Sequence, residues 1–355
     1  MEKKILMFGP YKKGQDTPLP GGIARWVFDF INSPYINAAY FEIVDLSIVG
    51  DRYKKSNIFK KFRNEFLRAR RISKQTKNAL KNNSFDVAHF HSSCGKLGVV
   101  RDYFLLKKLA KKKVKIITHF HCNLNLHANQ GWLTNKFFKK TVAISSKVIV
   151  LNEISMNEIK IINPTSNVIN IPNFIKYGEV RTTPKKIAET INNIVFVGFV
   201  QKEKGINEIY EVARVFPDIT FKLIGKISLE FKTVDKPNNV ALMNVANRET
   251  IFKELDSADL FLFPSHSEGF SLAMLEAMAR GLPIICTDVG ANKDMINNNS
   301  GGIITKVNSA SEIIDAINMM KSVDFRTSCS IYNVEKVKTM YTDEIVIRKI
   351  LELYE

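Results

Sequence analysis

The sequence contains few cysteines and no long apolar run, and both shortages exclude classes of protein. Only 4 of the 355 residues are cysteine, and no Cys-x-x-Cys pair occurs, so neither a disulfide-rich fold nor a cysteine zinc site is expected. Buried free thiols in a reducing compartment are the better interpretation. No apolar run approaches the ~18 residues of a membrane-spanning helix, and the run in "MEKKILMFGP" is too short for a signal peptide. We therefore expect a soluble, cytoplasmic protein.

Acidic residues are scarce in the first half of the chain, where lysine and arginine predominate. Residues 1–150 contain 29 Lys and Arg against 9 Asp and Glu, a net charge of +20, whereas residues 151–355 contain 23 against 26, a net charge of −3. Such a basic surface suits anionic lipid, a lipid diphosphate or nucleic acid, or it is only a solvated face. Because no helix-turn-helix, zinc-finger or RNA-binding pattern accompanies the charge, no nucleic-acid partner is expected.

Strand-like and helix-like segments alternate along nearly the whole chain. The first series of strands runs from "KKILMFG" through "FDVAHFH" and "VKIITHFH" to "KVIVLN", after which "NVINIPNF" follows. The second series runs from "NIVFVGFV" through "ITFKLIG", "VALMN" and "LFLFP" to "PIICT". Alternation of this kind predicts parallel sheets, and a polar, proline-bearing stretch near residues 172–187 separates two doubly wound α/β domains. In such sheets the ligand crevice lies beyond the carboxyl ends of the strands.

One segment, "PSHSEGFSLAMLEAMARGLPIICTDVG", follows a short apolar strand and contains two glutamates eight positions apart. Ser271 is a plausible N-cap for a helix over 272–280, and Gly281 ends it. The N-terminus of such a helix is a seat for phosphate. Glu276, about one turn further, can accept two hydrogen bonds from a ribose. Glu268, before the helix, is then left to face the reacting group.

These residues resemble a known family. "EGFSLAMLE" is similar to the E-x7-E signature of glycosyltransferase family 4, which comprises retaining enzymes with the GT-B fold. The similarity continues across residues 257–296, and includes "VFVGFVQKEKGI", "LPGGIARWV" and "THFHC". The resemblance implies two Rossmann-like domains facing a central cleft, with the C-terminal helix crossing back to the first domain. We place the acceptor-side domain at 1–175, the donor-binding domain at 176–339, and the returning helix at about 340–355.

The resemblance also implies a hexosyltransferase-type activity. A sugar would pass from a nucleoside-diphosphate sugar to a glycan or polyprenyl-diphosphate-linked acceptor, in cell-surface polysaccharide biosynthesis. The acceptor would meet the basic first domain, so an anionic membrane surface is an expected partner and the protein would be peripheral on the inner face of the membrane. The implied catalytic residues are His121, Glu268 and Lys204. The implied donor-binding residues are Gly21, Gly22, Lys204, Glu268, Gly269, Phe270, Ser271, Leu272 and Glu276.

Each of these residues has an implied role. Lys204 and the backbone amides of 270–272 would hold the donor diphosphate, Glu276 the ribose, and Glu268 the hydroxyls of the transferred sugar. His121 would sit over the donor sugar and the acceptor. The two N-terminal glycines, Gly21 and Gly22, would let their loop approach the phosphates, where a Cβ would block it.

The sequence lacks one of the two positively charged residues that the family resemblance implies for binding the donor phosphates. Phe199 stands where the family usually has an arginine, and Lys202 could supply that charge from another position. The residues Asn244 and Cys122 also replace usual glycines.

Two His-x-His pairs, His89 with His91 and His119 with His121, could bind a metal because alternation puts both members of a pair on one strand face. No Asp or Cys cluster accompanies them, and no Asp-x-Asp occurs. We therefore expect metal-independent transfer with no cofactor, and assign no role to His89, His91 and His119.

Two other functions remain open. A sugar-nucleotide epimerase shares the two-domain architecture but would act without an acceptor. A non-catalytic nucleotide-sugar-binding protein is disfavoured by the intact Glu268, Glu276 and Lys204, and slightly favoured by Phe199.

Overall fold

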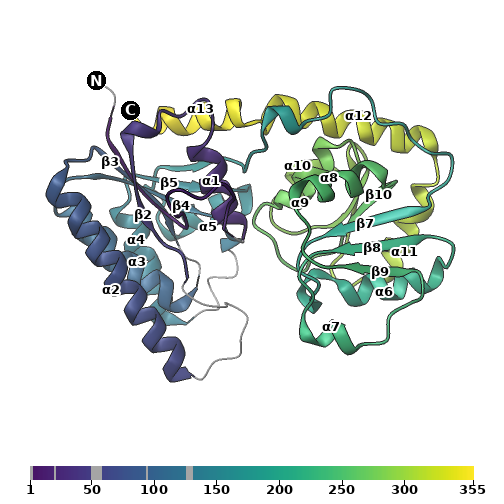
Figure 1. The fold of residues 1–355 in the computed structure, drawn as a ribbon, viewed down its shortest axis with the longest axis horizontal. Coiled ribbons are helices and arrows are strands. Elements are labelled where there is room, and N and C mark those ends of the chain that lie inside the picture. Colours follow the sequence, from purple (N-terminus) through teal and green to yellow (C-terminus); the bar gives the residue numbers. More distant parts are fainter. Residues whose placement is uncertain (1–2, 20, 49–57, 93–94, 125–130) are drawn as a thin grey trace. The chain divides into compact units, whose positions relative to one another are not determined.

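The computed structural model describes residues 3–19, 21–48, 58–92, 95–124 and 131–355 (Figure 1). The chain divides into two units: Met1–Asn173 with Val346–Glu355, and Phe174–Ile345. The sequence analysis placed this division at 175 and the start of the returning helix at about 340.

The first unit is built on a six-stranded parallel sheet in the order β2-β1-β3-β4-β5-β6. Its strands and helices are β1 Ile5–Gly9, α1 Gly22–Ile31, β2 Phe41–Asp45, α2 Ile58–Asn82, β3 Val87–Ser92, α3 Lys96–Ala110, β4 Lys115–Phe120, α4 Trp132–Ile144, β5 Lys147–Val150, α5 Glu153–Ile162 and β6 Val168–Asn170, with α13 Asp343–Tyr354 returning to it at the end of the chain.

The two faces of this sheet differ because side chains alternate along each strand. On β3, Ala88 and Phe90 belong to the apolar cluster that includes α2 and α3. His89 and His91 alternate with them and meet Trp26 of α1. One face of the strand is therefore hydrophobic, whereas the other places imidazole rings beneath a tryptophan.

The second unit holds another six-stranded parallel sheet, in the order β12-β11-β10-β7-β8-β9. Its elements are η3 Tyr177–Glu179, β7 Asn193–Val197, η4 Lys202–Lys204, α6 Ile206–Val215, β8 Thr220–Ile224, α7 Leu229–Thr233, β9 Val240–Met243, α8 Arg248–Ser257, β10 Leu260–Phe263, α9 Leu272–Ala279, β11 Ile284–Thr287, α10 Asn292–Ile296, β12 Gly302–Thr305, α11 Ala310–Met319 and α12 Val323–Met340. Helix α9 packs with α12, and α6 packs with α11 (Figure 1). The strand order reverses direction between β7 and β10, so the ligand crevice of this sheet is expected there.

The predicted fold class is confirmed, and two edge strands are additions to it. The sequence analysis did not predict β2 or β12. Strand β2 carries the acidic Glu42 and Asp45 and is only half-buried over most of its length, so its apolar alternation is weak. Strand β12 is four residues long and begins at a glycine. Neither strand has the continuous apolar run that marks the central strands.

The cysteines differ from one another. Cys286 and Cys329 are free and buried, as predicted. Cys122 is disulfide-bonded, so the expectation of a free thiol is wrong there, and Cys94 lies outside the described residues. Among the helices that the structure describes, none is long and apolar enough to cross a membrane.

Candidate active site

The loops that follow β7 and β10 carry the candidate donor-binding residues of the second unit. Lys204 ends the η4 turn after β7, and Gly205 follows it in the left-handed conformation at φ 74°. A Cβ on Gly205 would lie 2.1 Å from the carbonyl oxygen of Pro264, just after β10. Only glycine allows this approach, and it brings the two loops together at the point where the strand order reverses.

Lys204 and Glu268 form an ion pair within this arrangement. Their side chains are 22% and 13% exposed, and the Lys204 ammonium lies 5.8 Å from the ring centre of Phe263. The sequence analysis assigned Lys204 to the diphosphate and Glu268 to the sugar, without expecting contact between them. The ion pair shows that the Lys204 ammonium and the Glu268 carboxylate lie side by side in the structure.

Two residues after β11, which were not predicted from the sequence, hold the loop that carries Glu268. Gly290 has φ 57°, and a Cβ there would lie 2.2 Å from the Glu268 carbonyl oxygen. The backbone N–H of Ala291 donates to the Gly269 carbonyl at 3.0 Å. The motif quoted above ends at Gly290, so the glycine was visible in the sequence, but its partner was not.

A second missed contact anchors the loop from α6. His266 Nε2 lies 2.8 Å from Glu208 Oε1. Glu208 is 8% exposed, so this pair is largely shielded from water. Glu208 and His266 are 58 positions apart in the sequence, and no sequence pattern indicates that they form a pair.

Helix α9 begins at Leu272, directly after Ser271, as predicted. The Ser271 hydroxyl accepts a hydrogen bond from the Met274 N–H at 3.2 Å, which makes Ser271 the N-cap. The helix ends at Ala279, where Arg280 forms the C-cap and Gly281 turns the chain at φ 74°. The first turn of a helix presents backbone N–H groups that lack an intrahelical acceptor, and Leu272 and Ala273 stand in that turn beside Glu268.

Glu276 lies further along α9 and is already in contact with a cation. Arg248, the first residue of α8, donates to Glu276 Oε1 at 2.8 Å and also pairs with Glu179. The guanidinium group lies 4.8 Å from the ring centre of Phe252. Arg248 was not among the predicted residues. A ribose bound by Glu276 would therefore share this carboxylate with an arginine.

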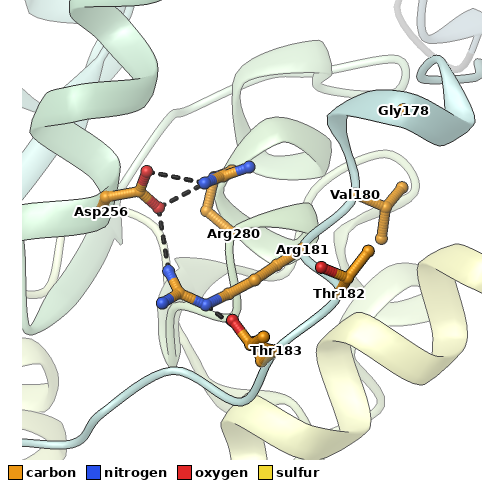
Figure 2. A pocket seen from close by; sticks show the side chains of 7 residues that line it. All are labelled: Gly178, Val180, Arg181, Thr182, Thr183, Asp256 and Arg280. Carbon is orange, nitrogen blue, oxygen red and sulfur yellow. Dashed lines mark hydrogen bonds and ion pairs between the residues drawn. The ribbon is translucent and has the colours of Figure 1, made fainter.

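A pocket of about 380 Å³ lies near the other end of α9 and has a structural role (Figure 2). Its charged lining is Arg181, Asp256 and Arg280. Arg280 donates two hydrogen bonds to Asp256, at 2.7 and 2.8 Å, and Arg181 donates a third at 3.1 Å. These charges satisfy one another and tie residues 181 and 280 to α8, which is a structural role.

The candidate residues of the first unit lie after β1 and β4. Gly21 is the N-cap of α1 with φ 112°, and Gly22 is the first residue of that helix. A Cβ on Gly21 would meet nothing within 4 Å. The positive φ of Gly21 by itself favours glycine at this position, and the close approach of this loop to the donor phosphates stays a prediction.

His121, the residue after β4, forms a cluster with His89 and His91 of β3 and His119 of β4. Its Nε2 lies 2.8 Å from His91 Nδ1, while His89 Nε2 lies 3.3 Å from His119 Nδ1. Burial lowers the pKa of His89 and of His121 to about 3, and a hydrogen bond with the Asn173 side chain opposes the shift at His121. Burial also holds the pKa values of His91 and His119 well below their usual range. All four rings are therefore neutral near pH 7.

Known proteins resemble this chain in sequence and in fold. Residues 181–332 match the family model for glycosyl transferases group 1. The solved structure of sucrose-phosphate synthase from Thermosynechococcus elongatus superposes with a TM-score of 0.77 at 14% identity, covering 99% of this chain and 98% of that one. Anabaena HepE in complex with UDP and glucose superposes with a TM-score of 0.70 at 14% identity, covering 99% of each chain. The chain is a glycosyltransferase with the GT-B fold.

Two relatives illustrate the similarity in sequence. An uncharacterized 41.2 kDa protein in the cps region of Klebsiella pneumoniae is 27% identical over 253 residues, which are 66% of this glycosyltransferase and 69% of the relative. The N,N'-diacetylbacillosaminyl-diphospho-undecaprenol alpha-1,3-N-acetylgalactosaminyltransferase of Campylobacter jejuni is 28% identical over 160 residues, which are 43% of this chain and 41% of the relative. The alignment thus spans less than half of the Campylobacter enzyme.

Proposed function

We propose that this glycosyltransferase is a retaining, family 4 enzyme that transfers a sugar from a nucleoside-diphosphate sugar to a glycan or lipid-linked acceptor in cell-surface polysaccharide synthesis. The observation that carries the proposal is the Lys204–Glu268 pair beside the Ser271-capped start of α9. Relatives in a cps region and on an undecaprenol-linked substrate support the pathway and the acceptor class, and a UDP complex of a structural neighbour supports the donor class.

In this proposal the donor diphosphate binds at the start of α9. The first-turn N–H groups and the helix dipole favour an anion there. Lys204 moves from Glu268 to the diphosphate, and Glu268 turns to hydroxyls of the transferred sugar. Glu276 binds the ribose, oriented by Arg248. Lys202 starts the η4 turn and is exposed, so it is available as the second cation where Phe199 replaces the usual arginine.

The reaction follows from these contacts. The bond between the anomeric carbon and the diphosphate oxygen breaks, and an acceptor hydroxyl forms the new bond on the same face. The departing diphosphate takes the proton of that hydroxyl. Lys204 and the α9 N-terminus stabilise the negative charge that grows on the diphosphate, which is the role a metal ion fills elsewhere. We therefore propose that transfer requires no metal. His121, neutral and half-buried, contributes a hydrogen bond rather than a charge.

The acceptor side is proposed to meet an anionic membrane through α3 and α4, which pack together. Trp132 is 72% exposed, and Leu133 beside it and Phe104 on α3 are also exposed. The Lys136 ammonium lies 5.4 Å from the Trp132 ring centre, and Lys107 lies near the Tyr103 ring on the same helix pair. Exposed aromatic and aliphatic side chains interleaved with lysines suit the interface of an anionic bilayer.

A panel of nucleotide sugars, assayed for nucleotide release with and without polyprenyl-diphosphate-linked acceptors, tests the proposal. Release that depends on the acceptor, with retained anomeric configuration by NMR, is the expected result. A changed nucleotide sugar formed without acceptor would identify an epimerase instead. Binding without any turnover across the panel would identify a non-catalytic binding protein.

A further inference from the structure

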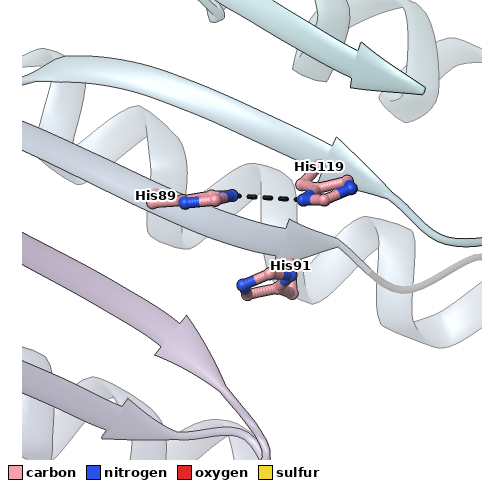
Figure 3. Close-up of side chains that lie close together, drawn as sticks. All are labelled: His89, His91 and His119. Atoms are coloured by element: carbon pink, nitrogen blue, oxygen red, sulfur yellow. Dashed lines mark hydrogen bonds between the residues drawn. The ribbon is translucent and has the colours of Figure 1, made fainter. Parts of the chain in front are cut away.

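The first unit contains a cluster of three buried histidines that the proposed reaction does not use. His89 and His91 come from β3 and His119 from β4, and His89, His91 and His119 are 0%, 3% and 0% exposed. Figure 3 shows the three rings close together, with His89 directed at His119. One nitrogen from each ring lies within 4.8 Å of the others. We propose that these three imidazoles form a structural site for a divalent transition-metal ion of the Zn²⁺ type.

The chemistry of the donor set selects this class of ion. Imidazole nitrogen suits Zn²⁺, Ni²⁺ and Cu²⁺, whereas Mg²⁺ and Ca²⁺ require oxygen ligands. The cluster contributes three nitrogen ligands from adjacent positions on two hydrogen-bonded strands, in which His91 is the register partner of His119. Three protein ligands leave one position of a tetrahedral ion for a further group.

The spacing of the rings is close to what one ion requires. With zinc–nitrogen bonds of about 2.0–2.1 Å, two ligand nitrogens of a tetrahedral site lie roughly 3.3 Å apart. His89 Nε2 and His119 Nδ1 are already 3.3 Å apart. The third ring, His91, offers a nitrogen within 4.8 Å of the ligand nitrogens of the other two.

An unsatisfied nitrogen is the second observation that points to a ligand. His91 Nε2 is buried and makes no hydrogen bond, although buried polar atoms in proteins nearly always have a partner. An unprotonated ring nitrogen that binds a metal has its lone pair satisfied.

The outer contacts of the cluster orient two rings for the same role. His89 Nδ1 lies 2.6 Å from the Tyr354 hydroxyl, and His91 Nδ1 lies 2.8 Å from His121 Nε2. A histidine ligand typically directs its other ring nitrogen to such an outer partner, which fixes the tautomer and the ring plane. With the proton on Nδ1 in each case, both rings present Nε2 to the ion.

The test measures metal content and not transfer activity, so it is independent of the proposed function. The full chain, without a histidine tag, is purified from zinc-supplemented cells and its metal content determined by mass spectrometry. About one zinc ion per chain is expected. Replacement by Co²⁺ should give the intense visible absorption of tetrahedral cobalt. The variants His91→Phe and His119→Gln should lose the ion, whereas His266→Gln, a histidine of the second unit, should keep it.

The zinc content of the wild-type chain tests the proposal even if a variant at His91 or His119 does not fold. Zinc content near zero in the folded wild type, after both purification and refolding with added Zn²⁺, would overturn the proposal. Bound zinc that is unchanged in a folded His91→Phe or His119→Gln variant would also overturn it, as would a Co²⁺ spectrum of octahedral type.

Discussion

Lys204 and Glu268, 64 positions apart in the chain, meet as an ion pair beside the start of α9. Without a donor, the acid neutralises the cation, and the site holds no uncompensated charge at this point. A bound diphosphate would compete with Glu268 for Lys204. The donor therefore has to separate the pair as it binds, and the two residues then divide between phosphate and sugar.

Replacement of Glu268 tests this exchange. In Glu268→Ala, Lys204 no longer has to leave its partner, so the bare nucleoside diphosphate should bind as well as in the wild type or more tightly. Turnover should fall by roughly 10- to 150-fold, because loss of hydrogen bonding between the sugar and a charged acceptor costs about 1.5–3 kcal/mol. Calorimetric titration and initial rates separate the two effects. Glu335→Ala, at a surface pair with Lys338, is the control. Weaker diphosphate binding in a folded Glu268→Ala protein would contradict the exchange.

Replacement of Glu276 should fail differently. Glu276→Ala removes the proposed hydrogen bonds to ribose, so it should weaken binding of both the bare diphosphate and the sugar nucleotide by roughly 10- to 150-fold. The ribose is common to both ligands, which explains the parallel loss. Titration of the two ligands measures it, and Glu249→Ala, an exposed acid on α8, serves as the matched control. If Glu276→Ala binds the diphosphate like wild type, the ribose assignment is wrong.

Membrane binding should depend on the exposed face of α3 and α4. The double variant Trp132→Ser, Lys136→Glu should sediment less with anionic vesicles, because each lysine near such a surface contributes about 1 kcal/mol and the indole supplies the interfacial anchor. Binding should weaken with added salt. Leu229→Ser changes an equally exposed apolar side chain in the second unit and should leave sedimentation unchanged. Equal sedimentation of the wild type and the double variant with anionic vesicles, or equal binding of the wild type to neutral and anionic vesicles, would count against the membrane proposal.

Transfer should continue in the presence of a chelator. Lys204 and the α9 N-terminus supply the charge stabilisation, and the histidine cluster lies in the first unit among buried side chains. Initial rates in EDTA should match those without it over the time of the assay. Loss of transfer in EDTA, restored by Mg²⁺ or Mn²⁺, would show that the reaction itself needs a metal.

The thiols of Cys286 and Cys329 should resist alkylation in the native protein. Burial raises the pKa of the Cys286 thiol, with a smaller contribution from Asp288, and burial raises the pKa of Cys329 to about 12. Because the thiolate is the reactive form, neither should react with iodoacetamide near pH 8 until the chain unfolds. Peptide mapping by mass spectrometry, with and without denaturant, measures the labelling. Rapid native labelling of Cys286 would show that β11 opens readily.

The sequence predicted what depends on local pattern, and it did not predict what depends on tertiary contact. The Ser271 cap and the Gly281 stop are set by a few neighbouring residues, so the α9 boundaries were accessible. The pairing of Arg248 with Glu276 joins α8 to α9 across 28 positions, and an arginine at a helix start carries no signal of its partner. The same holds for His266 with Glu208.

The arrangement of the histidines could be predicted only in part from the sequence. Alternation placed each His-x-His pair on one strand face. The structure bears this out for His89 and His91 on β3, whereas His121 is the residue after the end of β4. The adjacency of the pairs depends on the β3–β4 register, and the depth of their burial depends on α1 lying over them. Neither can be obtained from spacing, so the sequence could suggest a ligand set without placing its members together.

The contact between His89 and Tyr354 has a consequence for the order in which the protein is made. Residues 346–355 complete the first unit, where the Leu353 carbonyl accepts from Lys115 and Lys147. The ribosome produces this segment only after the entire second unit, which at about 5–20 residues per second is roughly 10 to 35 s later. During that interval the strands of the first sheet have been synthesised, but α13 has not. His89 therefore lacks its hydrogen-bond partner, the Tyr354 hydroxyl. The first unit is therefore exposed to misassembly in the interval before residues 346–355 are synthesised.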